Sequence, residues 1–204
     1  ANVASLFVKD MPQGNINNCN KGQVDNDEKQ IGECEHTSLV DLTGGFGVDF
    51  AFMATRFTSA TYVERQPQLC QLVQYNLNAL NIGHAKVVCA EAESHLETIK
   101  RVSCIYLDPA RRDKNGGKTV LIEHCSPDIL QLLPTLLAKC GLLIVKLSPM
   151  LHWQQAIAQL QEQGAWVRQL HIVSVKNECK ELLFLITTKQ NKEQSANPSA
   201  AQSL

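Results

Sequence analysis

Three glycines within four residues follow an aspartate, and this turn is the strongest chemical signal in the sequence. The apolar run Ser38-Leu39-Val40 ends in Asp41, and glycines follow at 44, 45 and 47. Glycine lets the backbone adopt positive φ angles and lets its amides approach a ligand without an intervening side chain. Apolar residues resume at Val48, so the pattern predicts a strand, a tight turn and a helix whose first N–H groups face that ligand. We expect the ligand to have a nucleotide-like body.

The residues around this turn bear on which nucleotide is bound. A dinucleotide fingerprint needs a third glycine where the helix packs on the strand, and Phe50 stands there. A carboxylate at Asp41 suits a cationic amino-acid group better than a pyrophosphate. Residues 41–47, Asp-Leu-Thr-Gly-Gly-Phe-Gly, resemble the first motif of class I S-adenosylmethionine-dependent methyltransferases, with Thr43 in place of that motif's first glycine. S-adenosylmethionine is therefore the expected cofactor, and a dinucleotide oxidoreductase is a less favoured alternative.

Strand and helix patterns alternate after the turn, which predicts an α/β fold. The apolar periodicities indicate strands at 38–41, 61–64, 84–90, 102–107, 142–147, 167–175 and 182–187, and helices from about 47 and at 67–81, 91–100, 129–139 and 153–163. Strands this apolar are typical of a sheet covered on both faces. We expect a Rossmann-like, doubly wound, seven-stranded sheet that is mostly parallel, with one antiparallel strand in a closing hairpin.

Length and composition fit one folded domain between two polar segments. The chain has 204 residues, 44% of them hydrophobic, and a net charge of −1, which gives no overall bias towards nucleic acid. Residues 1–37 are predicted to be a linker or a remnant of a preceding domain, 38–188 the methyltransferase domain, and 189–204 a flexible tail or linker. This organisation suggests a catalytic domain cut from a longer protein. The eight scattered cysteines and the lack of a long apolar run suggest a cytoplasmic protein without disulfides, and no residue spacing suggests a metal site.

Three acidic residues follow predicted strands, where ligands of doubly wound sheets bind. Glu64 stands nineteen residues after Gly45, where a carboxylate can accept both hydroxyls of a ribose. Glu91, with neighbouring Ala92, follows the third strand, and in methyltransferases of this class an acid there commonly faces the adenine amino group. Asp108 ends the fourth strand and is expected to face both the cofactor and the group that receives the methyl. A plain helix-terminal acid is the alternative for Glu91.

Four sequence blocks together resemble bacterial class I methyltransferases that carry a THUMP-like domain. The blocks are Asp-Leu-Thr-Gly-Gly-Phe-Gly-Val-Asp at 41–49, Leu-Asp-Pro-Ala-Arg-Arg-Asp at 107–113, Lys-Leu-Ser-Pro-Met at 146–150 and Asn-Glu-Cys-Lys-Glu-Leu at 177–182. The resemblance implies an RNA substrate, tRNA or rRNA. The second block stands where amino-group methyltransferases have Asp/Asn-Pro-Pro-aromatic, but it has Ala110 and Arg111 instead. Arg111 is expected to contact phosphate near the reaction centre, and a salt-bridged loop is the alternative.

A further resemblance concerns the acceptor. Asp108, Lys146 and Glu181 are similar to the Asp, Lys and Glu of the tetrad in ribose 2′-O-methyltransferases, where a lysine helps the target hydroxyl to lose its proton. The tetrad's first lysine has no clear counterpart, with Lys29 only a guess. Lys146 is therefore a candidate catalytic residue, and a structural pair with Glu181 is the alternative. A non-enzymatic RNA-binding module that retains the cofactor pocket also stays open.

Overall fold

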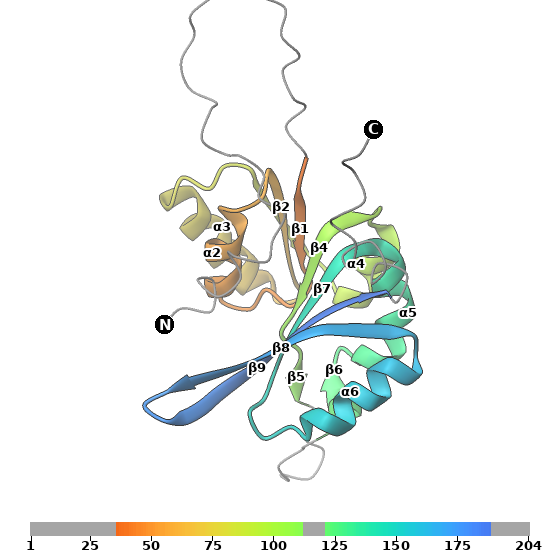
Figure 1. Cartoon of the computed structure of the whole chain (residues 1–204). Helices are drawn as coiled ribbons and strands as arrows, with labels where there is room; N and C mark the ends of the chain where they lie inside the picture. The colour runs from red at the N-terminus through yellow and green to blue at the C-terminus, as the bar shows by residue number, and fades with distance from the viewer. Residues whose placement is uncertain (1–35, 112–120, 189–204) are drawn as a thin grey trace, which may run out of the picture.

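The computed structural model describes residues 36–111 and 121–188, which form a seven-stranded sheet between two layers of helices (Figure 1). The strand order is β3-β2-β1-β4-β7-β9-β8. Within this sheet only β9 runs antiparallel to its neighbours β7 and β8. The strands are β1 (Ser38–Asp41), β2 (Ser59–Glu64), β3 (Ala85–Cys89), β4 (Val102–Leu107), β7 (Cys140–Leu147), β8 (Ala165–Val175) and β9 (Glu178–Thr188). The predicted fold class is confirmed.

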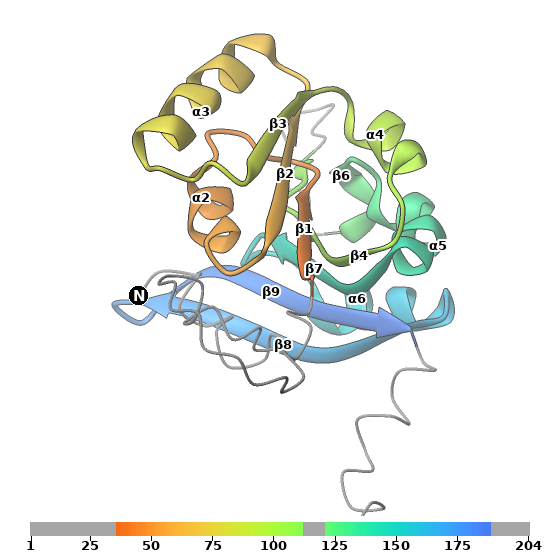
Figure 2. The same ribbon diagram turned by 90° about the horizontal axis from the view of Figure 1, so that it is seen from above.

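The helices divide between the two faces of the sheet, as Figure 2 shows from above. Helices α2 (Val48–Ala54) and α3 (Pro67–Ala79) cover one face, and α4 (Ala92–Thr98), α5 (Ile129–Lys139) and α6 (Trp153–Glu162) cover the other. Each helix buries one apolar stripe at helical spacing, such as Cys70, Val73 and Leu77 of α3. Pro67 begins α3, where its missing N–H costs nothing, and the Asp128 side chain caps α5 by accepting from the backbone N–H of Gln131.

The middle of the sheet explains where a ligand site forms. Strand β1 lies between β2 and β4, so the order reverses direction at β1, and the connections leave the sheet on opposite faces. Strand β4 is buried from Cys104 to Leu107 because both of its faces are covered. The carboxyl ends of β1, β2, β3, β4 and β7 meet at one edge, and the crevice at that edge is where such sheets bind ligands.

Several element bounds differ from the sequence-based expectation, because backbone pairing extends past the apolar runs. Strand β9 begins at Glu178 rather than 182, since the hairpin turns tightly at Lys176 and Asn177, which both have positive φ. A small ladder of β5 (Ala110–Arg111) and β6 (Cys125–Ser126) was not predicted, and the 3₁₀ helix η3 (Ile122–His124) precedes β6. Apart from His36 and Thr37, the expected flanks 1–37 and 189–204 lie outside the described residues. None of the helices in the described ranges has the length and apolarity that crossing a membrane requires.

Candidate functional site

A cavity of about 790 Å³ opens at the carboxyl ends of the central strands and collects the residues predicted to hold a cofactor. Asp41, Thr43, the glycine turn, Glu64, Glu91, Ala92 and Asp108 all line it. They come from the ends of four strands that are far apart in the sequence. The volume lies within the range of about 300–1,000 Å³ that is common for sites of drug-sized ligands. The cavity therefore has room for a nucleoside with an amino-acid tail.

The glycine turn has the backbone that its sequence predicts. Gly45 and Gly47 have φ angles of 52° and 73°, in the left-handed region that favours glycine. Tyr62 holds the turn in place, because its hydroxyl donates a hydrogen bond to the Gly45 carbonyl. Gly44 lies against the same ring, and a Cβ at this position would stand 2.0 Å from Cε2 of Tyr62. Gly44 is thus required by a close approach to a fully buried side chain.

We expect Gly44→Ala to lower the free energy of unfolding by about 1–3 kcal/mol, the usual cost of overpacking a core. Tyr62 cannot move away without losing its bond to the turn. Gly83→Ala is the matched control, because a Cβ at Gly83 would meet nothing within 4 Å. Urea denaturation of both variants measures the difference, and equal stabilities would contradict the predicted clash.

Asp41 ends β1 at the floor of the cavity with 1% of its surface exposed. Its Oδ1 accepts from the backbone N–H of Thr43 at 2.9 Å. Burial raises the pKa of Asp41 to about 7, against the opposing effect of the Thr43 N–H. A buried carboxylate that is costly to ionise gains most from a cationic partner, which agrees with the amino-acid group expected there.

The raised pKa of Asp41 predicts a pH dependence of stability. The folded chain holds this proton more tightly than the unfolded chain, so the contribution of Asp41 to stability falls as pH rises from about 4 to about 7. Asp41→Asn keeps an acceptor for Thr43 and removes the titration. In urea denaturation without ligand, we expect the variant to gain stability relative to the native chain across that range. A difference that does not change with pH would contradict the assignment.

Thr43 connects the glycine turn to the end of β4, which explains the departure from the family motif at this position. Its Oγ1 accepts from the backbone N–H of Asp108 at 2.6 Å. A glycine has no side chain to make this contact. The threonine thereby fixes the backbone of Asp108, at the end of β4.

Glu64 and Glu91 line the cavity in different ways. Glu64 bonds the turn itself, because Oε2 accepts from Gly45 N at 3.1 Å and Oε1 accepts from Gln66 N at 2.9 Å. Glu91 is exposed and stands at the N-cap of α4 without a side-chain capping bond. Ala92 beside it is buried. The Glu91 carboxylate is therefore free of helix capping, whereas Glu64 already positions the glycine turn.

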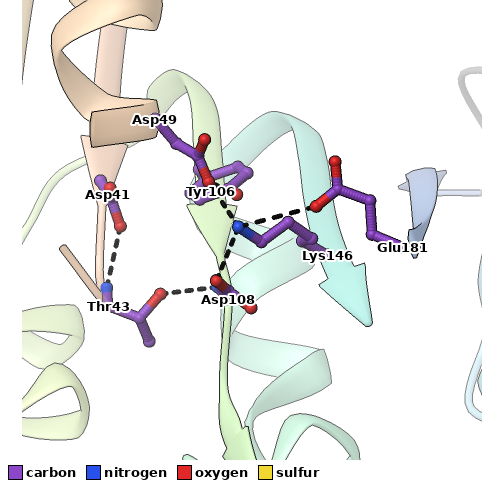
Figure 3. Close-up of polar contacts among 7 residues, drawn as sticks. All are labelled: Asp41, Thr43, Asp49, Tyr106, Asp108, Lys146 and Glu181. Atoms are coloured by element: carbon purple, nitrogen blue, oxygen red, sulfur yellow. Dashed lines mark hydrogen bonds and ion pairs between the residues drawn. The ribbon is translucent and has the colours of Figure 1, made fainter. Parts of the chain in front are cut away.

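Lys146, at the end of β7, lies among three carboxylates (Figure 3). Its Nζ is 2.5 Å from Oδ2 of Asp49 and 2.8 Å from Oδ2 of Asp108. Oε2 of Glu181 is 3.9 Å away. The three acids reach the ammonium from α2, from the end of β4 and from β9. The predicted set of Asp108, Lys146 and Glu181 is thus brought together, and Asp49 joins it.

The Lys146 ammonium stabilises the carboxylates around it, whereas the carboxylates repel one another. Burial lowers the pKa of Lys146, but the bonds to Asp108 and Asp49 outweigh it and hold that pKa above its usual value. Burial raises the pKa of Asp108 and of Glu181, and the Lys146 ammonium opposes both shifts. Lys146 is therefore a firmly held cation in this arrangement, suited to donating hydrogen bonds and to stabilising negative charge.

Asp49, and Tyr106 beside it, have no role in the sequence analysis. Asp49, in the first turn of α2, accepts from Lys146 and from the hydroxyl of Tyr106 at 2.8 Å. The only sequence signal was an acid just after the glycine turn.

Arg111 lies on β5, but its side chain is outside the described structure, so its predicted contact with phosphate stays a prediction. The guessed counterpart Lys29 is also outside the described residues.

Comparison with known proteins gives matches among solved structures only. No family profile and no curated protein matches the chain. A proposed methyltransferase from Porphyromonas gingivalis W83 is 31% identical, with a TM-score of 0.64 over 75% of this chain, which spans only 37% of that protein. An rRNA methylase from Streptococcus thermophilus has a TM-score of 0.55 at 15% identity, covering 75% of this chain and 87% of its own. A proposed methyltransferase from Streptococcus mutans in complex with S-adenosylhomocysteine has a TM-score of 0.54 at 14% identity, and the match covers 74% of this chain and 88% of that protein.

The chain shares the fold of these methyltransferases. The sequence-based expectation of a Rossmann-like methyltransferase sheet therefore agrees with the neighbours as well as with the strand order. The two streptococcal proteins are too distant in sequence to carry more than the fold. One fold hosts many reactions, so the activity has to be argued from the residues of the site.

Proposed function

We propose that this chain is an S-adenosylmethionine-dependent methyltransferase domain that methylates RNA, tRNA or rRNA, in the cytoplasm. The cavity carries the proposal, because it combines a glycine turn with acids at the places where such a cofactor needs them. Asp41 would hold the amino-acid group, Glu64 the ribose and Glu91 with Ala92 the adenine edge. Membership in the THUMP-like methyltransferase family belongs to the same proposal.

The charge of the cavity supports this cofactor over a dinucleotide. Six carboxylates line it, from Asp41, Asp49, Glu64, Glu91, Glu93 and Asp108, against two cations, from Arg65 and Lys146. S-adenosylmethionine has a net positive charge, whereas a pyrophosphate would be repelled. When bound, the cofactor supplies an electrophilic methyl group on its sulfonium. The protein then has to hold an acceptor in line with that methyl, which is catalysis by positioning.

RNA as the acceptor rests on the four sequence blocks and on the names of structural neighbours such as the S. thermophilus rRNA methylase. The acidic cavity does not suit the phosphates themselves. We therefore place the RNA backbone outside the cavity, with only the reacting group reaching Asp108 and Lys146.

A ribose hydroxyl is the second candidate acceptor, favoured by the convergence of Asp108, Lys146 and Glu181. There Lys146 would stabilise the developing alkoxide as a cation. Nuclease digestion of the methylated RNA, followed by mass spectrometry of the nucleosides, distinguishes methylation of the ribose from methylation of the base. A methyl on the sugar supports the ribose candidate, and a methyl on the base excludes it.

Calorimetric titration tests the cofactor first. We expect S-adenosylhomocysteine to bind the purified chain and NADH not to bind. Transfer of tritium from labelled S-adenosylmethionine to RNA then tests the reaction. Binding of NADH alone would overturn the proposal, whereas cofactor binding without transfer to any RNA would favour the non-enzymatic module.

A further inference from the structure

A second, smaller cavity adjoins the cofactor cavity and shares two of its lining residues, Asp108 and Lys146. Its volume is about 180 Å³. Because both cavities are lined by these residues, they meet at Asp108 and Lys146. A group held in it would face the cofactor across Asp108 and Lys146.

The size of this cavity limits what it can hold. With about 30 Å³ per water, it equals roughly six waters, well below the ~300 Å³ at which sites for drug-sized ligands begin. It therefore has room for one ring and not for a whole nucleotide. A ring attached to a longer chain fits this description, with the rest of the chain outside.

Apolar residues form one part of the cavity walls, and the charged or polar residues Asp108, Lys146, Ser148, Lys180 and Glu181 form the other. The apolar lining comes from the end of β4, from β7, from the loop that leads to α6 and from the start of η3, with the residues Pro109, Leu121, Leu147, Pro149 and Leu151. A sugar placed against these apolar residues would lose hydration of its hydroxyls without regaining hydrogen bonds from them. The flat faces of a heterocycle need no such partners. Apolar walls can thus take the part of the stacking aromatic that the Asp108-Pro109 motif lacks.

One edge of the cavity is polar and offers both a donor and an acceptor. Lys146 has three N–H donors and uses two, on Asp49 at 2.5 Å and Asp108 at 2.8 Å. Within the described ranges the Glu181 carboxylate has only its 3.9 Å ion pair with Lys146. One ammonium donor and one carboxylate acceptor therefore stay available side by side. Each nucleobase presents such a neighbouring donor and acceptor on its Watson–Crick edge.

We propose that this second cavity is the acceptor subsite and that it takes a single nucleobase turned out of its stack. The inference rests on the proposed function, since it names the group that the cofactor would methylate. The base lies between the apolar walls with its polar edge at Lys146 and Glu181. Turning a base out of the stack costs a few kcal/mol, and the contacts to walls and edge offset that cost.

The test uses the whole chain saturated with S-adenosylhomocysteine, so that the cofactor cavity is blocked. Adenine, guanine, cytosine and uracil are titrated in turn, with methyl ribofuranoside as the sugar probe. The readout is the ¹³C-methyl NMR spectrum, and we expect at least one base to shift Leu147 and Leu151 without shifting Leu80. Shifts with the sugar alone, or with no probe, would overturn the inference.

Cavity-filling variants give a second readout. We expect Leu151→Trp to weaken the binding of that base at least about tenfold, equivalent to ~1.4 kcal/mol, while calorimetry shows unchanged binding of S-adenosylhomocysteine. Leu121→Phe serves the same purpose if the tryptophan variant does not fold. Leu80→Trp, at an exposed site outside both cavities, is the matched control.

The outcomes separate the two proposals. Loss of S-adenosylhomocysteine binding in the native chain would remove the proposed function itself. Normal cofactor binding, together with base binding that both filling variants leave intact, would overturn only the acceptor subsite.

Discussion

Replacing Lys146 by methionine is expected to abolish methyl transfer and to lower the free energy of unfolding by about 2–3 kcal/mol near pH 8. The value lies between the ~1 kcal/mol of an exposed ion pair and the ~3–5 kcal/mol lost when one partner of a buried pair is removed. The lysine side chain is 18% exposed, and its removal leaves Asp49, Asp108 and Glu181 facing one another. Urea denaturation measures the stability, and transfer of labelled methyl to RNA measures the activity.

The destabilisation of this variant should shrink as pH falls. Burial raises the pKa of Asp108 and Glu181, and loss of the ammonium that opposes it raises both pKa values further. Protonation of these carboxylates at acidic pH then relieves the repulsion, whereas the native cluster gains nothing comparable. Lys180→Met is the control, since Lys180 makes an exposed pair with Glu178 and should cost less than about 0.5 kcal/mol. Equal effects of the two substitutions would show that the cluster adds no stability.

Glu64→Ala is expected to weaken S-adenosylhomocysteine binding by at least about a hundredfold, which corresponds to ~2.7 kcal/mol. The substitution removes two charge-assisted bonds to backbone N–H groups, of Gly45 and Gln66, and hydrogen bonds to charged groups are worth ~1.5–3 kcal/mol each. It also removes the acceptor proposed for the ribose hydroxyls. The variant therefore loses the bonds that hold the glycine turn in shape, and it also loses the proposed contact with the ribose.

Two further variants separate these effects on calorimetric titration. Glu64→Gln keeps one acceptor oxygen for the turn, so we expect its affinity to lie between those of the alanine variant and the native chain. Glu97→Ala, on the exposed side of α4 and outside the cavity, should bind like the native chain. Native affinity in Glu64→Ala would contradict both parts of the assignment.

The gathering of the residues proposed to hold the cofactor could be predicted from the sequence, because its signals are local. The glycine turn needs glycines at fixed positions after Asp41, and Glu64 follows at the spacing that one strand and one helix impose. Strand ends of a parallel sheet meet at one edge, so these residues were expected in one place. The structure places them around one cavity and adds the tight contact of Gly44 with Tyr62.

The surroundings of Lys146 depended on the tertiary structure. The resemblance suggested Asp108, Lys146 and Glu181, but nothing in the spacing of Asp49, 97 residues from Lys146, indicated that it makes the shortest contact to that lysine. The small cavity beside the cluster was not predictable either, since its walls come from four separate segments.

The sequence alone thus determined the fold class and the glycine turn, because strand and helix periodicities and glycine positions are set by neighbours along the chain. Only the tertiary structure decided which carboxylates surround Lys146 and where an acceptor can lie. Those contacts follow from the twist and register of the sheet, and many combinations of distant side chains are compatible with the same local patterns.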